Sequence, residues 1–533
     1  MKGQTMKIRS LILVSFAVTA AASYADFYFK ATDGQNDWGY TNSWYTDAGR
    51  TAPSTKLPDN TSSIYIPAGE DVLATNIDTK TINLFVGSTA GGVGKLTLGT
   101  GTKLWPGFNS YYIGNVAGST GVLHIAKGGQ VYGEASGGLQ NFYIGRSGYG
   151  VVTNQGSMFT REQSVIGVDA GSYGKYVHDG GTWSRCYGSK VLCVGQNGVG
   201  EVEIVSGTFD ANNPELILGG NAAEPSVLTV RNGAKIVFGH LMVGGGYGSY
   251  GGTIWKYLDA QAKVVLEGGT MVTKSSSTAN FQLGAYTGSV VRAVADQKQF
   301  GELRGYGTVG GSEQPVYINL GRGLIEADGG TLDLNAVSRL TNCLAPYNAC
   351  LGKLSAVNGG DIRFPRRSFS AASASLNIGC TPAGAVPDIP GAAHVTIAGA
   401  AASDEKFIRG GICANEVCPF PQEKLTRLEG RVLGCWRFGL FADGTSWTAD
   451  KAASFATATV QFKYDRSLVT DATKPIYVYR RINGNWCNLG RADVNDEGLV
   501  TTPALAPVAD AVYNIGEFAV VQHLKGGMTI SLQ

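Results

Sequence analysis

Apolar residues recur along the chain in short groups that each end in glycine. This happens eight times between residues 84 and 284, and the steps between the glycines are 27, 31, 22, 28, 24, 25 and 40 residues. The glycines are Gly87, Gly114, Gly145, Gly167, Gly195, Gly219, Gly244 and Gly284. A step of this size that returns along a chain is the signature of a repeat architecture.

Two positions in each group are apolar with the spacing of a β-strand. The residue one before the glycine is aliphatic in all eight groups, and the residue three before it is large and apolar in seven. Because every second side chain of a strand points to the same face, the two positions predict one buried face. The glycine predicts a bend with positive φ or a close approach of the backbone.

A second apolar group lies between successive marker glycines, as in residues 96–98, 123–125 and 202–204, and a turn glycine follows it. Each unit of about 26 residues thus holds two or three short strands and no helical pattern. Such strands bury no face alone, but coils stacked about 4.8 Å apart close a core. The pattern predicts an all-β protein with a right-handed parallel β-helix over residues 76–365.

The position two before each glycine, which we call the outer column, has an unexpected composition. This position is predicted to face away from the core, yet it is apolar in seven groups before reaching Gln282. The seven residues are Phe85, Tyr112, Tyr143, Val165, Cys193, Ile217 and Met242. A strand that is apolar on both faces is normally covered on both. Either another part of the chain covers this column, or it is a surface for self-association or ligand contact.

The segments on either side of the repeat have different patterns. Residues 26–75 contain Trp38 and Trp44 and are expected to cap the open end of the stack. Residues 366–395 are rich in Ala, Ser, Gly and Pro and are predicted to be a linker. Over residues 396–533, separate strands divided by turn signals predict a β-sandwich.

Composition and the N-terminus narrow the function classes. The net charge is +2 and no basic stripe is present, so nucleic acid is not an expected partner. Residues 1–25 combine basic residues, an apolar run over 11–22 and a small-x-small motif, which predicts a cleaved signal peptide. We expect a secreted or cell-surface protein with no transmembrane span in the mature chain, since no later apolar run is long enough.

Parallel β-helices include enzymes of the pectin-lyase-like type, which need carboxylates clustered on one face. The acids of this repeat are scattered, and no recognised nucleophile or phosphate-binding motif occurs. The acids that share a coil are Asp169 with Asp179, and Glu201 with Glu203 and Asp210. We therefore predict no catalytic residue, no metal site and no cofactor. The isolated imidazoles of His124 and His178 are expected at the surface.

One insertion interrupts the regular spacing. About ten extra residues lie between Gly244 and Gly284. The aromatic residues of this insertion are Tyr247, Tyr250, Trp255 and Tyr257. We keep two interpretations: a loop whose aromatic faces bind sugar rings, as Phe85, Tyr112 and Tyr143 of the outer column could also do, or a loop that folds over the stacked strands.

Nine cysteines are present, and an exported protein can oxidise them. Local spacing favours the disulfides Cys343–Cys350 and Cys413–Cys418, although the sequence does not determine the connectivity. No CxxC motif is present, so a zinc site of the usual spacing is not expected.

The glycine-punctuated strands and the Trp-rich cap resemble the β-helical passenger regions of bacterial autotransporters and related secreted repeat proteins, over roughly residues 35–365. The resemblance is compositional and does not extend to a C-terminal membrane barrel, which would need many alternating strands. It implies a non-enzymatic bacterial surface or matrix protein, a stalk or adhesin, whose partners are glycans, other surface proteins or copies of itself. The alternatives are a polysaccharide lyase or glycoside hydrolase of the pectin-lyase-like type, and a carbohydrate-binding protein.

Overall fold

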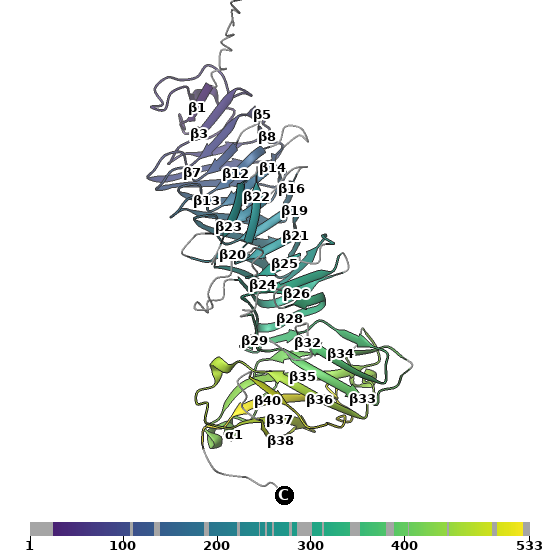
Figure 1. Ribbon diagram of the computed structural model, residues 1–533. Helices are drawn as coiled ribbons and strands as arrows, with labels where there is room; N and C mark the ends of the chain where they lie inside the picture. Colours follow the sequence, from purple (N-terminus) through teal and green to yellow (C-terminus); the bar gives the residue numbers. More distant parts are fainter. Residues whose placement is uncertain are drawn as a thin grey trace, which may run out of the picture.

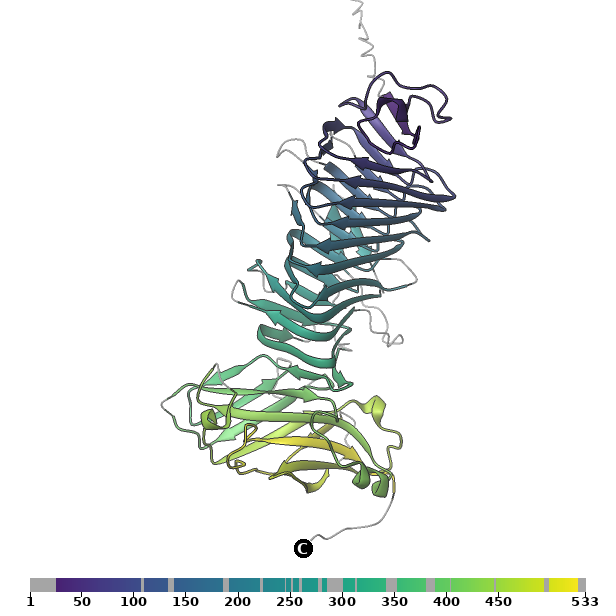
Figure 2. The same ribbon diagram turned by 180° about the vertical axis from the view of Figure 1, so that it is seen from behind.

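A computed structural model describes residues 25–525, apart from 107–109, 133–138, 186–190, 221–223, 245, 251–252, 258–260, 277–279, 285–300, 312–313, 342–351, 380–388, 403, 445–446 and 493–497. An elongated rod of stacked strands ends in a wider unit near the C-terminus (Figures 1 and 2). The described residues are mainly strands, with α1 (Gln422–Leu428) and three short 3-10 turns, η1 (Thr41–Ser43), η2 (Ala449–Lys451) and η3 (Arg466–Leu468). The all-β prediction is therefore confirmed.

The rod consists of three ladders of parallel strands, in which a strand pairs with the one a repeat further along the chain. The first ladder contains β3 (Ser62–Ile66), β6 (Asn83–Val86), β9 (Ser110–Ile113), β12 (Leu139–Ile144), β14 (Ser157–Ile166), β17 (Val191–Val194), β19 (Thr208–Leu218), β21 (Lys235–Val243), β25 (Phe281–Leu283) and β27 (Val316–Leu320). This ladder carries the marker glycines and the outer column.

The second ladder carries the apolar groups that lie between the markers. It contains β4 (Asp71–Ala74), β7 (Gly92–Leu98), β10 (Ser119–Ile125), β13 (Tyr149–Asn154), β15 (Tyr173–Asp179), β18 (Val199–Ser206), β20 (Ser226–Arg231), β24 (Ala262–Thr273), β26 (Gly301–Gly310), β28 (Gly323–Thr341) and β29 (Lys353–Val357). All these pairings are parallel, so successive repeats stack on one another.

The third ladder follows the turn glycines. It contains β5 (Asp78–Thr81), β8 (Lys103–Pro106), β11 (Gln130–Val131), β16 (Thr182–Arg185) and β30 (Asp361–Arg363), together with parts of β14, β19, β21, β24, β26 and β28. Five of these long strands turn a corner and take part in two ladders. β28 takes part in all three, because its residues 337–341 pair with β27 of the first ladder.

The core of the rod follows the two predicted inward positions. All eight residues one before a marker glycine are fully buried, and those three before it are no more than 1% exposed. The eight marker glycines all have positive φ, from 55° to 90°. At Gly145 an added Cβ would lie 2.0 Å from the carbonyl oxygen of Tyr173 in the next coil. The bend and the close approach predicted for these glycines are both present.

The N-terminal segment closes one end of this core. β1 (Ala25–Phe29) pairs in parallel with β3 and antiparallel with β2 (Trp44–Tyr45). Trp44 is fully buried, packs edge-on against Phe29 and Trp38 at 5.1 and 4.9 Å between ring centroids, and donates its indole N–H to the carbonyl of Trp38. Coil stacking already begins at β3 and β4, inside the range predicted for the cap.

The C-terminal unit is built from antiparallel strands in two sheets. The first sheet contains β31 (Arg367–Phe369), β34 (Lys406–Cys413), β35 (Arg431–Phe441), β40 (Gly516–Gln522), β37 (Ile476–Ile482) and β38 (Asn485–Ala492). The second contains β32 (Ser373–Ile378), β33 (Ala393–Ala398), β36 (Thr457–Lys463) and β39 (Leu499–Thr501). Phe462 of the second sheet packs against Trp436 and Phe518 of the first, at 4.9 and 5.1 Å between centroids.

The segment 366–395, which the sequence predicts as a linker, belongs to the C-terminal unit. It contains β31 and β32 and the start of β33, and these strands pair with strands of both sheets. The prediction is therefore wrong for the described part of this segment. Ala and Ser are small enough to pack in strands, so their abundance does not by itself indicate an unstructured connection.

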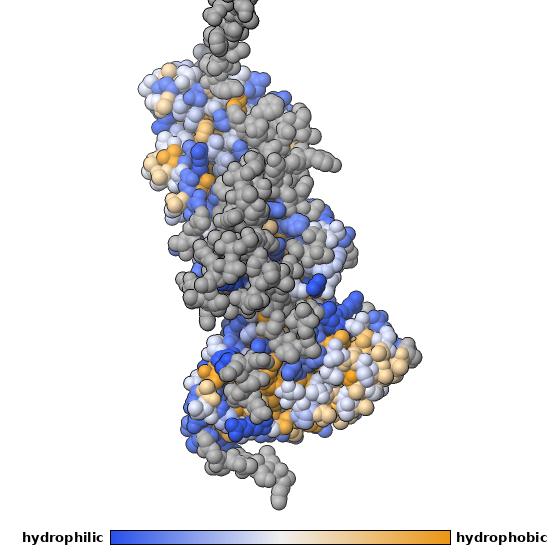
Figure 3. Space-filling model, viewed as in Figure 1, coloured by the Kyte–Doolittle hydropathy of each residue, from blue (hydrophilic) through white to orange (hydrophobic). Residues whose placement is uncertain are grey.

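The rod joins the C-terminal unit by direct strand pairing. β30, the last strand of the third ladder, pairs antiparallel with β34, with Asp361 opposite Cys413. Described residues of the rod show mostly hydrophilic colours in the space-filling view, whereas larger apolar areas lie on the C-terminal unit (Figure 3). The two parts also differ in strand direction, since the ladders of the rod are parallel and the sheets of the C-terminal unit are antiparallel.

Candidate functional site

The outer column forms one continuous register along the first ladder. Each of its residues lies opposite the next, from Tyr28 and Tyr65 through Phe85 and on to Gln282. Tyr28 and Tyr65 extend the column by two rings that the sequence analysis missed. Their groups lack a marker glycine, since Tyr65 is followed by Ile66 and Pro67.

The first part of the outer column is a stack of five aromatic rings. Their successive centroids are 4.6, 4.6, 4.9 and 5.2 Å apart, and their planes differ by 16° or less. All five side chains are half-buried. The stacked residues are Tyr28, Tyr65, Phe85, Tyr112 and Tyr143.

This geometry limits what the stack can bind. Parallel rings at these distances cover one another's faces, so their edges and the tyrosine hydroxyls are what remains at the surface. The guanidinium of Arg146 lies 4.9 Å from the centroid of Tyr112. Burial, with a contribution from Asp26, raises the pKa of Tyr65 to about 12. The stack therefore offers a row of neutral edges and hydroxyls, whereas a sugar ring that packs on aromatic rings needs an open face.

The second part of the outer column is buried. Val165, Cys193, Ile217 and Met242 are between 0% and 7% exposed, and they form a hydrophobic cluster separate from the core of the rod. The hairpin of β22 (Gly246–Tyr250) and β23 (Thr253–Tyr257) contacts β19 and lies over the ladder strands (Figure 1). For this part of the column, internal cover is the interpretation that the burial supports.

The predicted sugar-binding loop is this same hairpin. Its backbone register places Tyr247 opposite Lys256, and Trp255 opposite Gly248. The side chains of Tyr247, Tyr250, Trp255 and Tyr257 lie outside the described part of the structure. The role of these side chains in ligand contact stays a prediction.

Most described acids of the repeat are held in ion pairs and hydrogen bonds, whereas burial raises the pKa of Glu215. Glu203 lies 2.8 Å from the Lys175 ammonium and 2.7 Å from the Arg231 guanidinium, and these contacts lower its pKa. Gln155 and Ser206 donate hydrogen bonds to Asp179 and lower its pKa as well. A general acid needs a raised pKa to hold a proton at neutral pH, so Glu203 and Asp179 are poorly suited to that task.

Asp169 and Asp210, two further acids of the repeat, also form hydrogen bonds or ion pairs with neighbouring side chains. Ser147 donates a hydrogen bond of 2.6 Å to Asp169, and the Lys274 ammonium lies 2.8 Å from Asp210. Within the residues that the structure describes, no group of three or more His, Cys, Asp or Glu side chains could hold a metal ion.

One of the two histidines is not where the sequence suggests. His124 is half-buried and contacts Gln155, but His178 is fully buried and lies 3.3 Å from the hydroxyl of Tyr176. Burial lowers the pKa of His178 to about 4. The expectation of a surface position is wrong for His178 because strand alternation in β15 places it inward together with Tyr176. The alternation of Tyr176 and His178 could have revealed this.

The predicted cysteine pairs have different outcomes. Cys343 and Cys350 lie outside the described residues. Cys413 and Cys418 are close enough for a hydrogen bond between their thiols, which together with burial raises the pKa of Cys413. They carry free thiols in this structure, and Cys435 lies opposite Cys413 in the β34–β35 register. The Cys413–Cys418 disulfide stays a prediction, with Cys435 as a neighbour that local spacing does not indicate.

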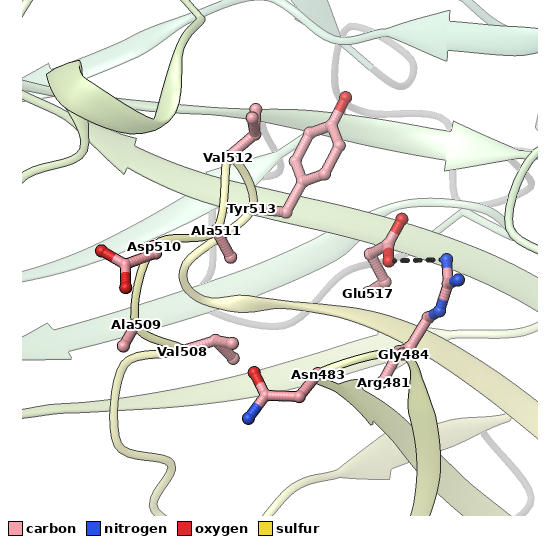
Figure 4. Close-up of a pocket in the computed structure, with 10 residues that line it drawn as sticks. All are labelled: Arg481, Asn483, Gly484, Val508, Ala509, Asp510, Ala511, Val512, Tyr513 and Glu517. Carbon is pink, nitrogen blue, oxygen red and sulfur yellow. Dashed lines mark hydrogen bonds and ion pairs between the residues drawn. The ribbon is translucent and has the colours of Figure 1, made fainter.

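A pocket of ≈ 440 Å³ opens in the C-terminal unit between the β37–β38 turn and the loop 508–513 (Figure 4). One wall is the ion pair of Arg481 with Glu517, whose N and O atoms are 3.2 Å apart. Asn483 and Asp510 lie at the rim, and Tyr513 stands at the opposite end from the turn. The apolar side chains of Val508, Ala511 and Val512 line the pocket beside the charged groups, the amide and the phenol. A mainly apolar lining with a few polar groups is typical of small-molecule sites.

Comparison with protein-family models, with curated proteins and with solved structures gave no match. None of the helices in the described residues is long and apolar enough to cross a membrane.

Proposed function

We propose that this protein is an exported, non-enzymatic surface or matrix protein. In this proposal its repeat is a right-handed parallel β-helix that acts as a rigid stalk. The C-terminal unit is a β-sandwich that anchors the stalk or presents it to a partner. The resemblance to autotransporter passenger regions and the N-terminal signal sequence point in the same direction.

The observation that carries the proposal is the run of parallel strand pairings that links successive repeats from β3 to β30, continuous in the first and second ladders. A repeat array in which each unit contacts its neighbours is stabilised along its whole length. The antiparallel β30–β34 pairing then extends the hydrogen bonding into the C-terminal unit without a flexible connection. Such an assembly keeps a fixed distance between its two ends, which is the property a stalk needs.

The chemistry of the described acids favours this proposal over a polysaccharide lyase or hydrolase. The carboxylates of Glu203, Glu302 and Glu326 each lie within 3 Å of a lysine or arginine nitrogen. A row of alternating charges on the outside of stacked coils stabilises neighbouring coils and keeps them soluble.

Two experiments test the proposal, one on export from cells and one on the shape of the purified protein. We expect the chain expressed with residues 1–25 to be exported and to begin at Asp26, as read by N-terminal mass spectrometry. We expect small-angle scattering of the mature protein to give one elongated particle at all concentrations of salt. Retention of residues 1–25 in an unexported protein, or turnover of an acidic polysaccharide by the purified chain, would contradict the proposal.

The pocket of Figure 4 favours a second, compatible function, which is binding of a neutral sugar by the C-terminal unit. A glycan array with the mature protein should then show binding that Glu517→Gln and Asn483→Ala weaken. Glu416→Gln, which changes a carboxylate outside the pocket, should leave that binding unchanged. Equal binding by all variants would place the sugar site elsewhere.

A further inference from the structure

A buried arginine lies where the rod joins the C-terminal unit. Arg409 is on β34, opposite Gly439 of β35, and only 2% of its surface is exposed. Two residues further along the chain, Gly411 pairs with Arg363 of β30, which is the last strand of the rod. The guanidinium of Arg409 lies 5.0 Å from the ring centroid of Trp447.

Two nitrogens of this guanidinium have no hydrogen-bond partner among the described residues. They are Nε and Nη2, and both atoms are buried. The N–H groups of Nε and Nη2 point in the same direction from one edge of the planar group. This edge is the one that holds two oxygens of a carboxylate or sulfate in a bidentate contact. The Trp447 ring attracts the cation but does not accept these two hydrogen bonds.

Further arginines surround the same tryptophan and the same strand. The guanidinium of Arg363 lies 5.3 Å from the Trp447 centroid. Its buried Nε has no hydrogen-bond partner among the described residues but lies 3.8 Å from the carboxylate of Asp361. Arg366 is exposed, lies 5.9 Å from the ring of Phe407 and donates to the carbonyl of Gly444. Burial and the charge of Arg366 both lower the pKa of Arg409.

The nearby carboxylates do not accept hydrogen bonds from Nε or Nη2 of Arg409. Asp361 forms an ion pair with Arg437, and Asp333 lies 3.7 Å from Arg363. Asp443 and Asp333 act on Arg409 only through their charges. Arg363 and Arg409 therefore lie beside Trp447, and Arg366 lies beside Phe407. The most deeply buried of the three, Arg409, keeps a bidentate edge without a hydrogen-bond partner among the described residues.

We propose that this junction binds an oxyanion, the carboxylate or sulfate group of an acidic ligand, with Arg409 as its bidentate floor. Arg363 and Arg366 form the cationic rim, and Trp447 holds the Arg409 guanidinium in place. The site lies between the last coil and the C-terminal unit, so a bound oxyanion also ties the two parts together. This proposal holds whether or not the stalk function is correct, because it depends only on the arginines of the junction.

The test is an anion titration of the full mature chain, followed by calorimetry and by the melting temperature. Sodium sulfate and sodium glucuronate are compared with sodium chloride at equal ionic strength. We expect a saturable heat of binding and a saturable rise in Tm with sulfate or glucuronate, and neither with chloride. A stronger response to sulfate indicates a tetrahedral group, and a stronger response to glucuronate indicates a carboxylate.

Variants then locate the response. Arg409→Met should abolish the saturable response and should melt no lower than the unmodified chain in chloride, because it removes an unpaired buried charge. Arg366→Gln, at an exposed position, should weaken the affinity about tenfold without loss of folding. Arg481→Met, which changes an arginine of the separate pocket, is the matched control and should respond like the unmodified chain.

Two results would overturn the proposal. One is a rise in Tm with sulfate that never saturates and that is the same in Arg366→Gln. This result would mean that salt stabilises the protein in general and that only water hydrates Arg409. The other is a saturable response that Arg481→Met loses and Arg366→Gln keeps, which places the anion at the pocket. If Arg409→Met fails to fold, the Arg366→Gln comparison still decides between these outcomes.

Discussion

The two parts of the outer column occupy the same position in the repeat, but their apolar side chains are shielded from water in different ways. Tyr28 to Tyr143 are rings that stack face to face and stay half-buried. Val165 to Met242 cannot stack in this way, and they are buried in the region where the β22–β23 hairpin contacts the ladder. Aromatic residues in a parallel ladder can therefore cover one another, whereas aliphatic residues need a separate covering element.

We expect the largest loss of stability from a charged residue placed in the buried part of the outer column. Ile217→Asp puts an unpaired carboxylate at a position that is 1% exposed, and should lower the free energy of unfolding by about 4 kcal/mol. Phe85→Asp is the matched change in the stacked part, where water reaches the side chain, and should cost about half as much. Urea unfolding of both variants measures the two losses. Equal losses would show that the two parts are equally covered.

We expect the second-largest loss of stability from removal of the β22–β23 hairpin. Replacing residues 246–257 by a Gly-Ser stretch of equal length exposes four apolar side chains, and the loss of stability is about 3 kcal/mol. The thiol of Cys193, now 3% exposed, should be alkylated at least about tenfold faster. Peptide mapping reads each thiol separately, and the exposed Cys487 should react equally in both proteins. An unchanged rate at Cys193 would mean that another element covers it.

Acid should weaken the coil at which the column changes from rings to aliphatic residues. His178 lies in β15 of that coil, and burial lowers its pKa from 6.5 to about 4. Between these values the unfolded chain binds a proton that the folded chain does not, so stability falls as the pH drops from 6.5 to 4. The expected contribution is about 2–3 kcal/mol.

His178→Phe removes this titration and keeps a ring of similar size. The difference in unfolding free energy between pH 7 and pH 4 should therefore be smaller in the variant by the same amount. His523 of the C-terminal unit, whose pKa burial also lowers to about 4, is present in both proteins and cancels in the comparison. An identical pH dependence in the two proteins would contradict the assignment to His178.

The smallest effect is the difference in stability loss between removing an interior ring and removing an end ring of the stack. Tyr112 has a neighbour on each face, and Tyr112→Ala should cost about 2 kcal/mol. Tyr28 has one stacked neighbour, Tyr65, and Tyr28→Ala should cost about 1 kcal/mol. Thermal and urea unfolding of the two variants check the order. If the end ring matters more than the interior ring, capping contacts at the N-terminus outweigh the stacking.

Much of the rod was predictable because its signals are local. The residues one and three before each marker glycine are buried as expected, and all eight glycines have the positive φ that the bend requires. A further signal was overlooked: Gly94, Gly121, Gly150, Gly174 and Gly200 lie in one register of the second ladder. A Cβ at Gly121 would lie 2.2 Å from the carbonyl oxygen of Val86, so this column also needs glycine.

The candidate sites were less predictable because they combine distant residues. The charged residues of the Figure 4 pocket, Arg481, Asp510 and Glu517, come from two strands and a loop, and no spacing in the sequence connects them. The arginines around Trp447 come from the end of the rod and from β34, at positions 363 and 409. The composition of residues 366–395 predicts a linker, which is wrong for the described part because composition carries no information about strand partners.

The repeat, the inward faces and the bends follow from the sequence alone, because each of them depends on side chains a few residues apart. Which part of the outer column is buried depends on the tertiary structure, because the β22–β23 hairpin, inserted between β21 and β24, contacts β19 in the region of the buried part. The tertiary structure also decided that the rings of Phe85, Tyr112 and Tyr143 present their edges and not their faces. That outcome follows from the parallel register of neighbouring coils, which brings residues more than twenty positions apart to within stacking distance.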